Sequence, residues 1–159
     1  MLLAAGAGAA LALGQLLLVR VWPGWRRYTV RAVSGLTMPF WQVLVVALMV
    51  AIAEELAYRA ALQPLTGLWV ASALFTLAHV RLDRAAWAQP DRPYAIAAVG
   101  LLYAISMAMG LLFMRVGLLA AMTAHFAYDL ILLHGYVRLG RNGAAEGARE
   151  APDRSGLTR

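Results

Sequence analysis

Apolar residues occur in five long runs that short polar stretches separate. A helix needs about 20 apolar residues to cross the hydrocarbon core of a bilayer, and most of these runs approach or exceed that length. Backbone polar groups in lipid must bond within their own segment, which favours helices throughout. The sequence therefore predicts an all-α bundle of about five membrane-spanning helices, namely Leu2–Val21, Ser34–Leu62, Gly67–Val80, Tyr94–Met114 and Leu118–Val137.

Turn-forming residues mark the limits of these runs. The second run ends at Gln63-Pro64-Leu65-Thr66-Gly67, where proline and glycine favour the end of a helix. From Arg138 onward the chain has no apolar period, which is typical of a disordered segment. We therefore expect a transmembrane domain over residues 1–137 and a disordered, arginine-rich cytoplasmic tail over residues 138–159.

The composition excludes an ordinary soluble domain. Hydrophobic residues make up 62% of the chain and charged residues only 14%, and the mean hydropathy is +0.68. Soluble domains are roughly 45–50% apolar. The chain has no cysteine, so disulfide bonds and thiolate metal sites are also excluded.

The basic residues are all arginine, and their placement predicts an orientation. Twelve of the fourteen lie in the first loop, the third loop and the tail, which would share one side of a five-helix bundle. By the positive-inside rule the tail is then cytoplasmic and the N-terminus lies outside. Arginines at the ends of apolar runs suit lipid headgroups, so no nucleic-acid partner is expected. The first run has its arginines after it, unlike a secretory signal, and is read as a retained membrane helix.

A few titratable residues interrupt the apolar runs. A carboxylate at the centre of a membrane helix costs on the order of 2.5–3.5 kcal/mol on insertion scales, so such residues mark functional sites. The alternative is that they form ion pairs which only link the helices. The residues are Glu54, Glu55, Arg59, His79, His125, Asp129 and His134.

The spacing of neighbouring residues suggests different roles for the two adjacent glutamates. Glu55 and Arg59 are four residues apart and can pair on one helix face. Glu54 is turned by about 100° from Glu55. We therefore predict that Glu54 is the catalytic base and that Glu55 and Arg59 support it, with the opposite assignment of the glutamates as the alternative.

Titratable residues from three of the apolar runs are predicted to lie at similar depths in the membrane. Glu54 and His79 lie on either side of the turn at Thr66-Gly67, each roughly 15–20 Å from it along its helix. His125 is roughly 12 Å into the fifth run by the same rise, and Asp129 follows it on the same face. The pattern predicts one cavity shared by Glu54, His79 and His125, with Asp129 able to orient the imidazole.

Three short motifs carry a resemblance to a known family. They are EExxxR at Glu54–Arg59, FxxxH at Phe75–His79 and HxxxN/D at His125–Asp129. In this order the motifs resemble those of the CAAX protease and bacteriocin-processing family, over about Trp41 to Leu133. The short chain is most similar to the compact, myxosortase-like end of that family.

The resemblance implies a glutamic-type intramembrane endopeptidase of the bacterial inner membrane that acts on a membrane-anchored or C-terminally tagged protein. By motif position, Glu54 and His79 would activate a water, and His125 and Asp129 would bind the oxyanion or complete the site. The best-known members have Asn at the position of Asp129. An ionised aspartate would repel an oxyanion, so Asp129 is expected to be protonated or to orient His125.

Neither a metal nor the protease activity follows from the residues alone. Glu54, His79 and His125 could be three zinc ligands, with water as the fourth. The sequence has no HExxH motif, and catalysis without a metal or other cofactor is favoured. Two other functions are alternatives: a non-catalytic membrane partner or immunity-type protein, and a small proton- or cation-coupled carrier.

Overall fold

All regular structure in residues 1–80 and 90–150, which the computed structural model describes, is helical. The all-α bundle predicted from the sequence is therefore confirmed, and its apolar helices make the chain an integral membrane protein. The elements are α1 (Leu2–Val21), α2 (Pro23–Val33), α3 (Phe40–Glu54), η1 (Glu55–Leu62, a π-helix), α4 (Gln63–Ala78), α5 (Arg92–Val116) and α6 (Leu118–Glu150).

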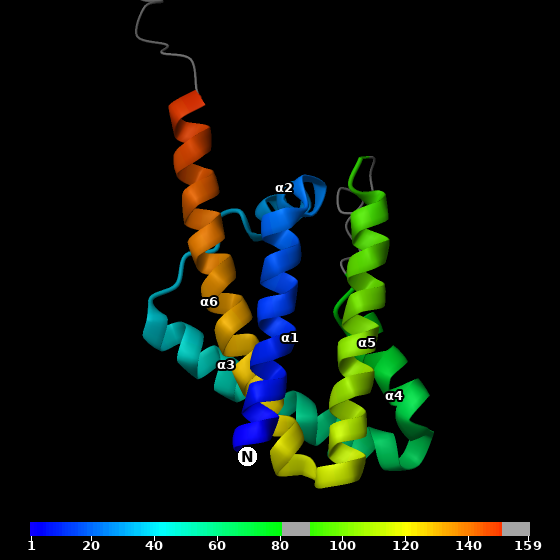
Figure 1. Ribbon diagram of the computed structural model, residues 1–159. Coiled ribbons are helices and arrows are strands. Elements are labelled where there is room, and N and C mark those ends of the chain that lie inside the picture. Colours follow the sequence, from blue (N-terminus) through cyan, green and yellow to red (C-terminus); the bar gives the residue numbers. More distant parts are fainter. Residues whose placement is uncertain (81–89, 151–159) are drawn as a thin grey trace, which may run out of the picture.

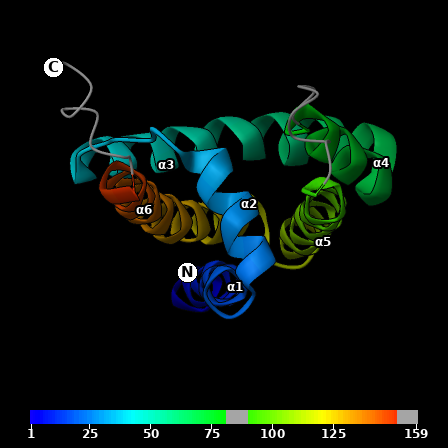
Figure 2. The same cartoon turned by 90° about the horizontal axis from the view of Figure 1, so that it is seen from above.

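The helices form two groups. α1, α5 and α6 run along a common direction, whereas α3 crosses behind them at a steep angle (Figure 1). Seen from above, α3 and α4 line one side of the bundle and α1 lies on the opposite side (Figure 2). α6 lies between these two sides, because it packs against both α1 and α3. It can therefore present side chains to each of them.

Four helical stretches of the described chain are long and apolar enough to cross a membrane. They are Leu2–Val21, Phe40–Ala78, Arg92–Val116 and Leu118–Arg141. The second combines two of the five expected spans, because α3, η1 and α4 follow one another without a loop. Pro64 does not interrupt this run, since it stands in the first turn of α4, where its missing N–H is not needed. The bend falls at Gly67, whose φ of +81° is accessible to glycine.

α2 was not expected from the sequence. Its eleven residues have too few apolar positions to resemble a span, yet Trp25 and Thr29 are buried against the bundle. The helix lies across one end of the molecule (Figure 2). Arg31 at its last turn pairs with Asp91 before α5, with 2.5 Å between Nη2 and Oδ1. The first and third predicted loops therefore meet at the same end.

The ends of the bundle differ in charge. α2, the start of α5 and the end of α6 lie at one end, and the N-terminus lies at the other (Figure 1). The arginine-rich segments of the described chain thus share one end, although Arg81, Arg84, Arg154 and Arg159 lie outside the described residues. Residues 138–150, which were predicted to be disordered, continue α6 as helix.

Close contact between α1 and α6 depends on Gly8. A Cβ atom at Gly8 would lie 1.9 Å from the carbonyl oxygen of Ala124. The absent side chain lets the two backbones approach, as small residues commonly do in membrane bundles. This contact holds α1 beside the part of α6 that carries His125.

Candidate active site

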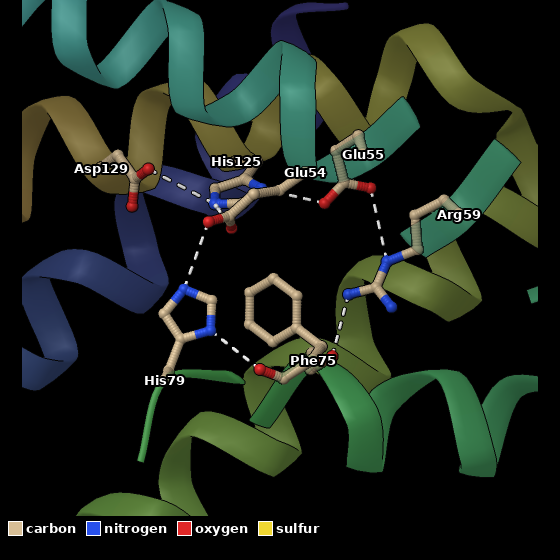
Figure 3. Close-up of polar contacts among 8 residues, drawn as sticks. Glu54, Glu55, Arg59, Phe75, His79, His125 and Asp129 are labelled. Atoms are coloured by element: carbon tan, nitrogen blue, oxygen red, sulfur yellow. Dashed lines mark hydrogen bonds and ion pairs between the residues drawn. The ribbon is translucent and has the colours of Figure 1, made fainter. Parts of the chain in front are cut away.

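Six of the seven titratable residues singled out in the sequence surround one cavity. They come from the end of α3, from η1, from the residue after α4 and from α6, and Figure 3 shows them directed toward one another. The cavity has a volume of about 320 Å³. The residues are Glu54, Glu55, Arg59, His79, His125 and Asp129.

Glu54 lies between the two histidines. Its Oε1 is 3.2 Å from Nε2 of His79, and its Oε2 is 3.7 Å from Nε2 of His125. Twenty-five residues of straight helix would separate Glu54 from His79 by about 37 Å, so the bend at Gly67 is what brings them together. The structure therefore places the three residues at one cavity, as the helical depths predicted.

The two adjacent glutamates face different surroundings. Glu54 is partly open, with 22% of its side chain exposed, whereas Glu55 is fully buried. Glu55 Oε2 lies 3.4 Å from Nε of Arg59, which is also fully buried. The spacing of four residues predicted this pair. Of the two glutamates, only Glu54 can be reached by a molecule in the cavity.

The local helix changes type between the two glutamates. α3 ends at Glu54, and the wider π-helix η1 begins at Glu55, with the N–H of Gln63 donating to the carbonyl of Tyr58 five residues earlier. π-Helical turns are rare and often occur at functional sites. The polar residues spaced by four from η1 to the first residue of α4, Glu55, Arg59 and Gln63, are all buried. This stripe faces the core, and no sequence pattern indicated the π-helix.

The hydrogen bonds of His79 define its tautomer. Nδ1 lies 2.8 Å from the carbonyl oxygen of Phe75, and because a carbonyl only accepts, Nδ1 carries the hydrogen. The imidazole also stacks on the Phe75 ring, with 4.5 Å between centroids (Figure 3). Nε2 is thereby directed at Glu54. Phe75 therefore packs against His79 through its ring and orients it through its backbone carbonyl.

His125 contacts carboxylates through both ring nitrogens. Nδ1 lies 2.9 Å from Oε1 of Glu55, and Nε2 lies 3.3 Å from Oδ2 of Asp129 (Figure 3). The contact with Asp129 was expected from the spacing of four residues. The contact with Glu55 was not, because it joins residues 70 positions apart on different helices. His125 is buried, and Nε2 is the nitrogen that faces Glu54 and Asp129.

Sequence reasoning missed three polar residues that line the cavity. Ser106 on α5 accepts a hydrogen bond of 2.9 Å from Nη2 of Arg59. Gln15 on α1 accepts from the Tyr128 hydroxyl at 2.6 Å and donates to Tyr136 at 2.8 Å. No sequence pattern singles out Ser106 or Tyr128. Gln15 could have been noticed, because it is the one polar side chain in the predicted first span besides the terminal arginine.

His134 lies away from this cavity. Its ring contacts Phe40 edge-on, with 5.6 Å between centroids. It is not among the cavity-lining residues. This environment indicates a packing role for His134.

Carboxylates and imidazoles are also common metal ligands. Among the residues whose side chains the structure describes, no group of three or more His, Cys, Asp or Glu residues is arranged to hold a metal ion. Glu54 instead contacts each histidine directly at 3.2 and 3.7 Å. The arrangement can share protons between a carboxylate and two imidazoles and present them to a molecule in the cavity.

Comparison with known protein families extends this description. Residues 36–131 match the family described as type II CAAX prenyl endopeptidase Rce1-like. No curated protein and no solved structure matches the chain. The matched segment includes all three motifs and every charged residue at the cavity, and it covers more than half of the sequence. The chain therefore belongs to the type II CAAX prenyl endopeptidase Rce1-like family.

Proposed function

We propose that this protein is a glutamic-type intramembrane endopeptidase that hydrolyses a peptide bond in a membrane-anchored protein. The observation that carries the proposal is the position of Glu54. Its carboxylate lies between Nε2 of His79 and Nε2 of His125 at the edge of a cavity inside an apolar helical bundle. Membership in a family of endopeptidases indicates a protease, and this geometry supports the roles that follow.

Glu54 and His79 are the proposed water-activating pair. Because Nδ1 of His79 donates to the Phe75 carbonyl, the neutral imidazole has its lone pair on Nε2. A water that enters between Nε2 of His79 and Oε1 of Glu54 moves these two acceptors apart from their 3.2 Å contact and can donate one hydrogen to each. As the water oxygen bonds to the substrate carbonyl carbon, Glu54 takes its proton. Glu54 then returns that proton to the leaving nitrogen when the C–N bond breaks.

His125 is the proposed donor to the oxyanion. Its Nδ1–H is bound to Glu55, so Nε2 must carry a second hydrogen to donate one. Asp129, at 3.3 Å from Nε2, stabilises that charged form of the imidazole. An aspartate at this position, where well-known relatives have Asn, then serves to keep His125 charged. A donor directed at developing negative charge is commonly the largest single contribution to such catalysis.

The proposal is tested with the purified protein in vesicles and a panel of substrates, namely prenylated peptides and reporters with a C-terminal membrane anchor. Glu54→Gln should lower kcat/KM by roughly 10²–10⁴-fold or more, because the amide cannot take the proton. The variant should unfold at the wild-type temperature, since the side chains are similar in size and Glu54 is partly exposed. His134→Gln is the matched control and should retain activity.

Two results would contradict the proposal. Cleavage by Glu54→Gln at the wild-type rate would exclude Glu54 as the base. We also propose that no metal takes part, so a zinc chelator should leave the rate of the wild-type protein unchanged. Loss of cleavage with the chelator, and its recovery on adding zinc, would instead assign Glu54, His79 and His125 as ligands.

A further inference from the structure

A series of polar contacts connects α5 to the candidate active site, although α5 carries none of the three family motifs. Ser106 accepts from Nη2 of Arg59 at 2.9 Å. Arg59 Nε lies 3.4 Å from Glu55 Oε2. Glu55 Oε1 accepts from Nδ1 of His125 at 2.9 Å. All four side chains are buried, so water does not compete strongly for these contacts.

This series determines which nitrogen of His125 faces the cavity. Arginine remains protonated in proteins, and its buried charge needs a counter-charge, which the Glu55 carboxylate supplies at 3.4 Å. A carboxylate only accepts hydrogen bonds, so Nδ1 of His125 must carry the hydrogen. Nε2 is then the nitrogen left for Glu54, Asp129 and a substrate. A buried carboxylate has the same role toward histidine in Ser-His-Asp proteases, where the wrong tautomer lowers kcat by about 10⁴-fold.

Ser106 is the residue that holds the guanidinium in this series. Among the side chains that the structure describes, Arg59 Nη1 has no hydrogen-bond partner, and Nε has only the 3.4 Å ion pair. The face of Phe75 lies 5.3 Å from Cζ, a contact that leaves rotation in the plane of the ring unrestricted. The hydroxyl of Ser106 is therefore the directional acceptor that fixes how Arg59 meets Glu55.

A second contact keeps α5 in register with the junction of η1 and α4. Gln63 donates to the carbonyl oxygen of Gly110 at 3.1 Å. Gln63 follows Arg59 by four residues, and Gly110 follows Ser106 by four, so the two contacts lie one helical turn apart. A Cβ at Gly110 would be 2.7 Å from the Gln63 side-chain oxygen, which shows how closely the elements approach.

We propose that Ser106 is a positioning residue that acts through Arg59 and Glu55 to keep a hydrogen on Nδ1 of His125. The effect of this residue on catalysis depends on the proposed protease function. Its effect on the protonation of His125 Nδ1 does not.

The test combines kinetics with ¹⁵N NMR of the imidazoles in the full-length protein in lipid. The chain has only three histidines, so each signal can be assigned by single substitutions. In the wild type, His125 should have a protonated Nδ1. In Ser106→Ala, a second population with Nδ1 unprotonated should appear. The value of kcat should fall roughly 10-fold with KM unchanged. Losses of this size are typical when a residue that orients a functional histidine is removed, as known from metal sites.

Ser72→Ala is the matched control. Ser72 is a fully buried serine on α4 whose hydroxyl has no partner among the described residues. Its loss should change neither the His125 signal nor kcat. Ser106→Thr, which retains the hydroxyl, should restore the wild-type signal and rate. If Ser106→Ala does not fold, Ser106→Cys is decisive, because its weak acceptor should give a smaller change of the same kind.

The outcomes separate the two proposals. A His125 signal that stays at its wild-type position in Ser106→Ala and Ser106→Cys would overturn the positioning role, whatever the activity. An equal change in Ser72→Ala would overturn it as well. If the signal changes as expected while the wild-type protein cleaves no substrate in the panel, the positioning role stands and the proposed protease function fails.

Discussion

Arg59 shows how a buried charge depends on its neighbours at the scale of single residues. Its guanidinium and the Glu55 carboxylate are fully buried, and His125 and Ser106 complete the set. Removing one member of a buried ion pair leaves the other charge without compensation. Such a change commonly costs about 3–5 kcal/mol, far more than the net value of the pair itself.

We therefore expect Arg59→Ala to lower the free energy of unfolding by about 3–5 kcal/mol. Thermal unfolding of the purified protein in detergent would measure the loss. The double variant Arg59→Ala with Glu55→Gln should recover part of it, because no unpaired charge then remains buried. Arg115→Ala is the control, since Arg115 is exposed and should be replaceable without loss. Wild-type stability of Arg59→Ala would show that the pair is not needed for folding.

At the scale of helices, the bend after η1 and the close contact of α1 with α6 position the site. The bend at Gly67 returns α4 toward α3, so His79 meets Glu54. The contact at Gly8 places α1 against α6, and Gln15 can then bond Tyr128, which adjoins Asp129. α1 lies outside the segment that matches the family, yet its Gln15 lines the cavity. The matched segment alone therefore does not enclose the cavity completely.

Gly8→Ala should accordingly destabilise the protein and lower activity. The added methyl group would lie 1.9 Å from a backbone oxygen of α6, so the two helices must separate. Overpacking of this kind costs typically about 1–3 kcal/mol. Gly6→Ala on the same helix is the matched control, because nothing lies within 4 Å of its Cβ position. Equal unfolding temperatures for the two variants would refute the importance of this contact.

For the molecule as a whole, the arginines predict how the bundle lies in the membrane. Those of α2, of the start of α5 and of the end of α6 share one end of the structure (Figure 1). The positive-inside rule assigns this end to the cytoplasm, and the end with the N-terminus and the turn at Gly117 to the outside. The absence of cysteine from the chain makes the orientation simple to measure.

Single cysteines at exposed positions would report the orientation. Val116→Cys, beside the turn between α5 and α6, should react with a membrane-impermeant thiol reagent added to intact cells, because that turn is expected outside. Arg27→Cys on α2 should react only in inverted vesicles. The reverse pattern would invert the proposed topology without changing the site.

The sequence by itself determined the membrane class, the helical fold and all the charged residues that line the cavity. Long apolar runs form helices in a bilayer. Because burying a charge there is costly, the few titratable residues within these runs stand out. Helical spacing was enough to pair Glu55 with Arg59 and His125 with Asp129, because those contacts lie within one turn. The three motifs that resemble those of a protease family are also short stretches that can be read directly from the sequence. The match over residues 36–131 supports this resemblance.

Only the tertiary structure decided how the helices meet. The contact of Glu55 with His125 and the bond from Arg59 to Ser106 join residues 70 and 47 positions apart, and no periodicity in the sequence encodes them. The joining of two expected spans into one bent run, the short helix α2 and the extension of α6 to Glu150 were also decided there. The joined run depends on one backbone angle, the positive φ of Gly67, and α2 is buried by packing against distant segments. Hydrophobic patterns along the chain carry little information about either.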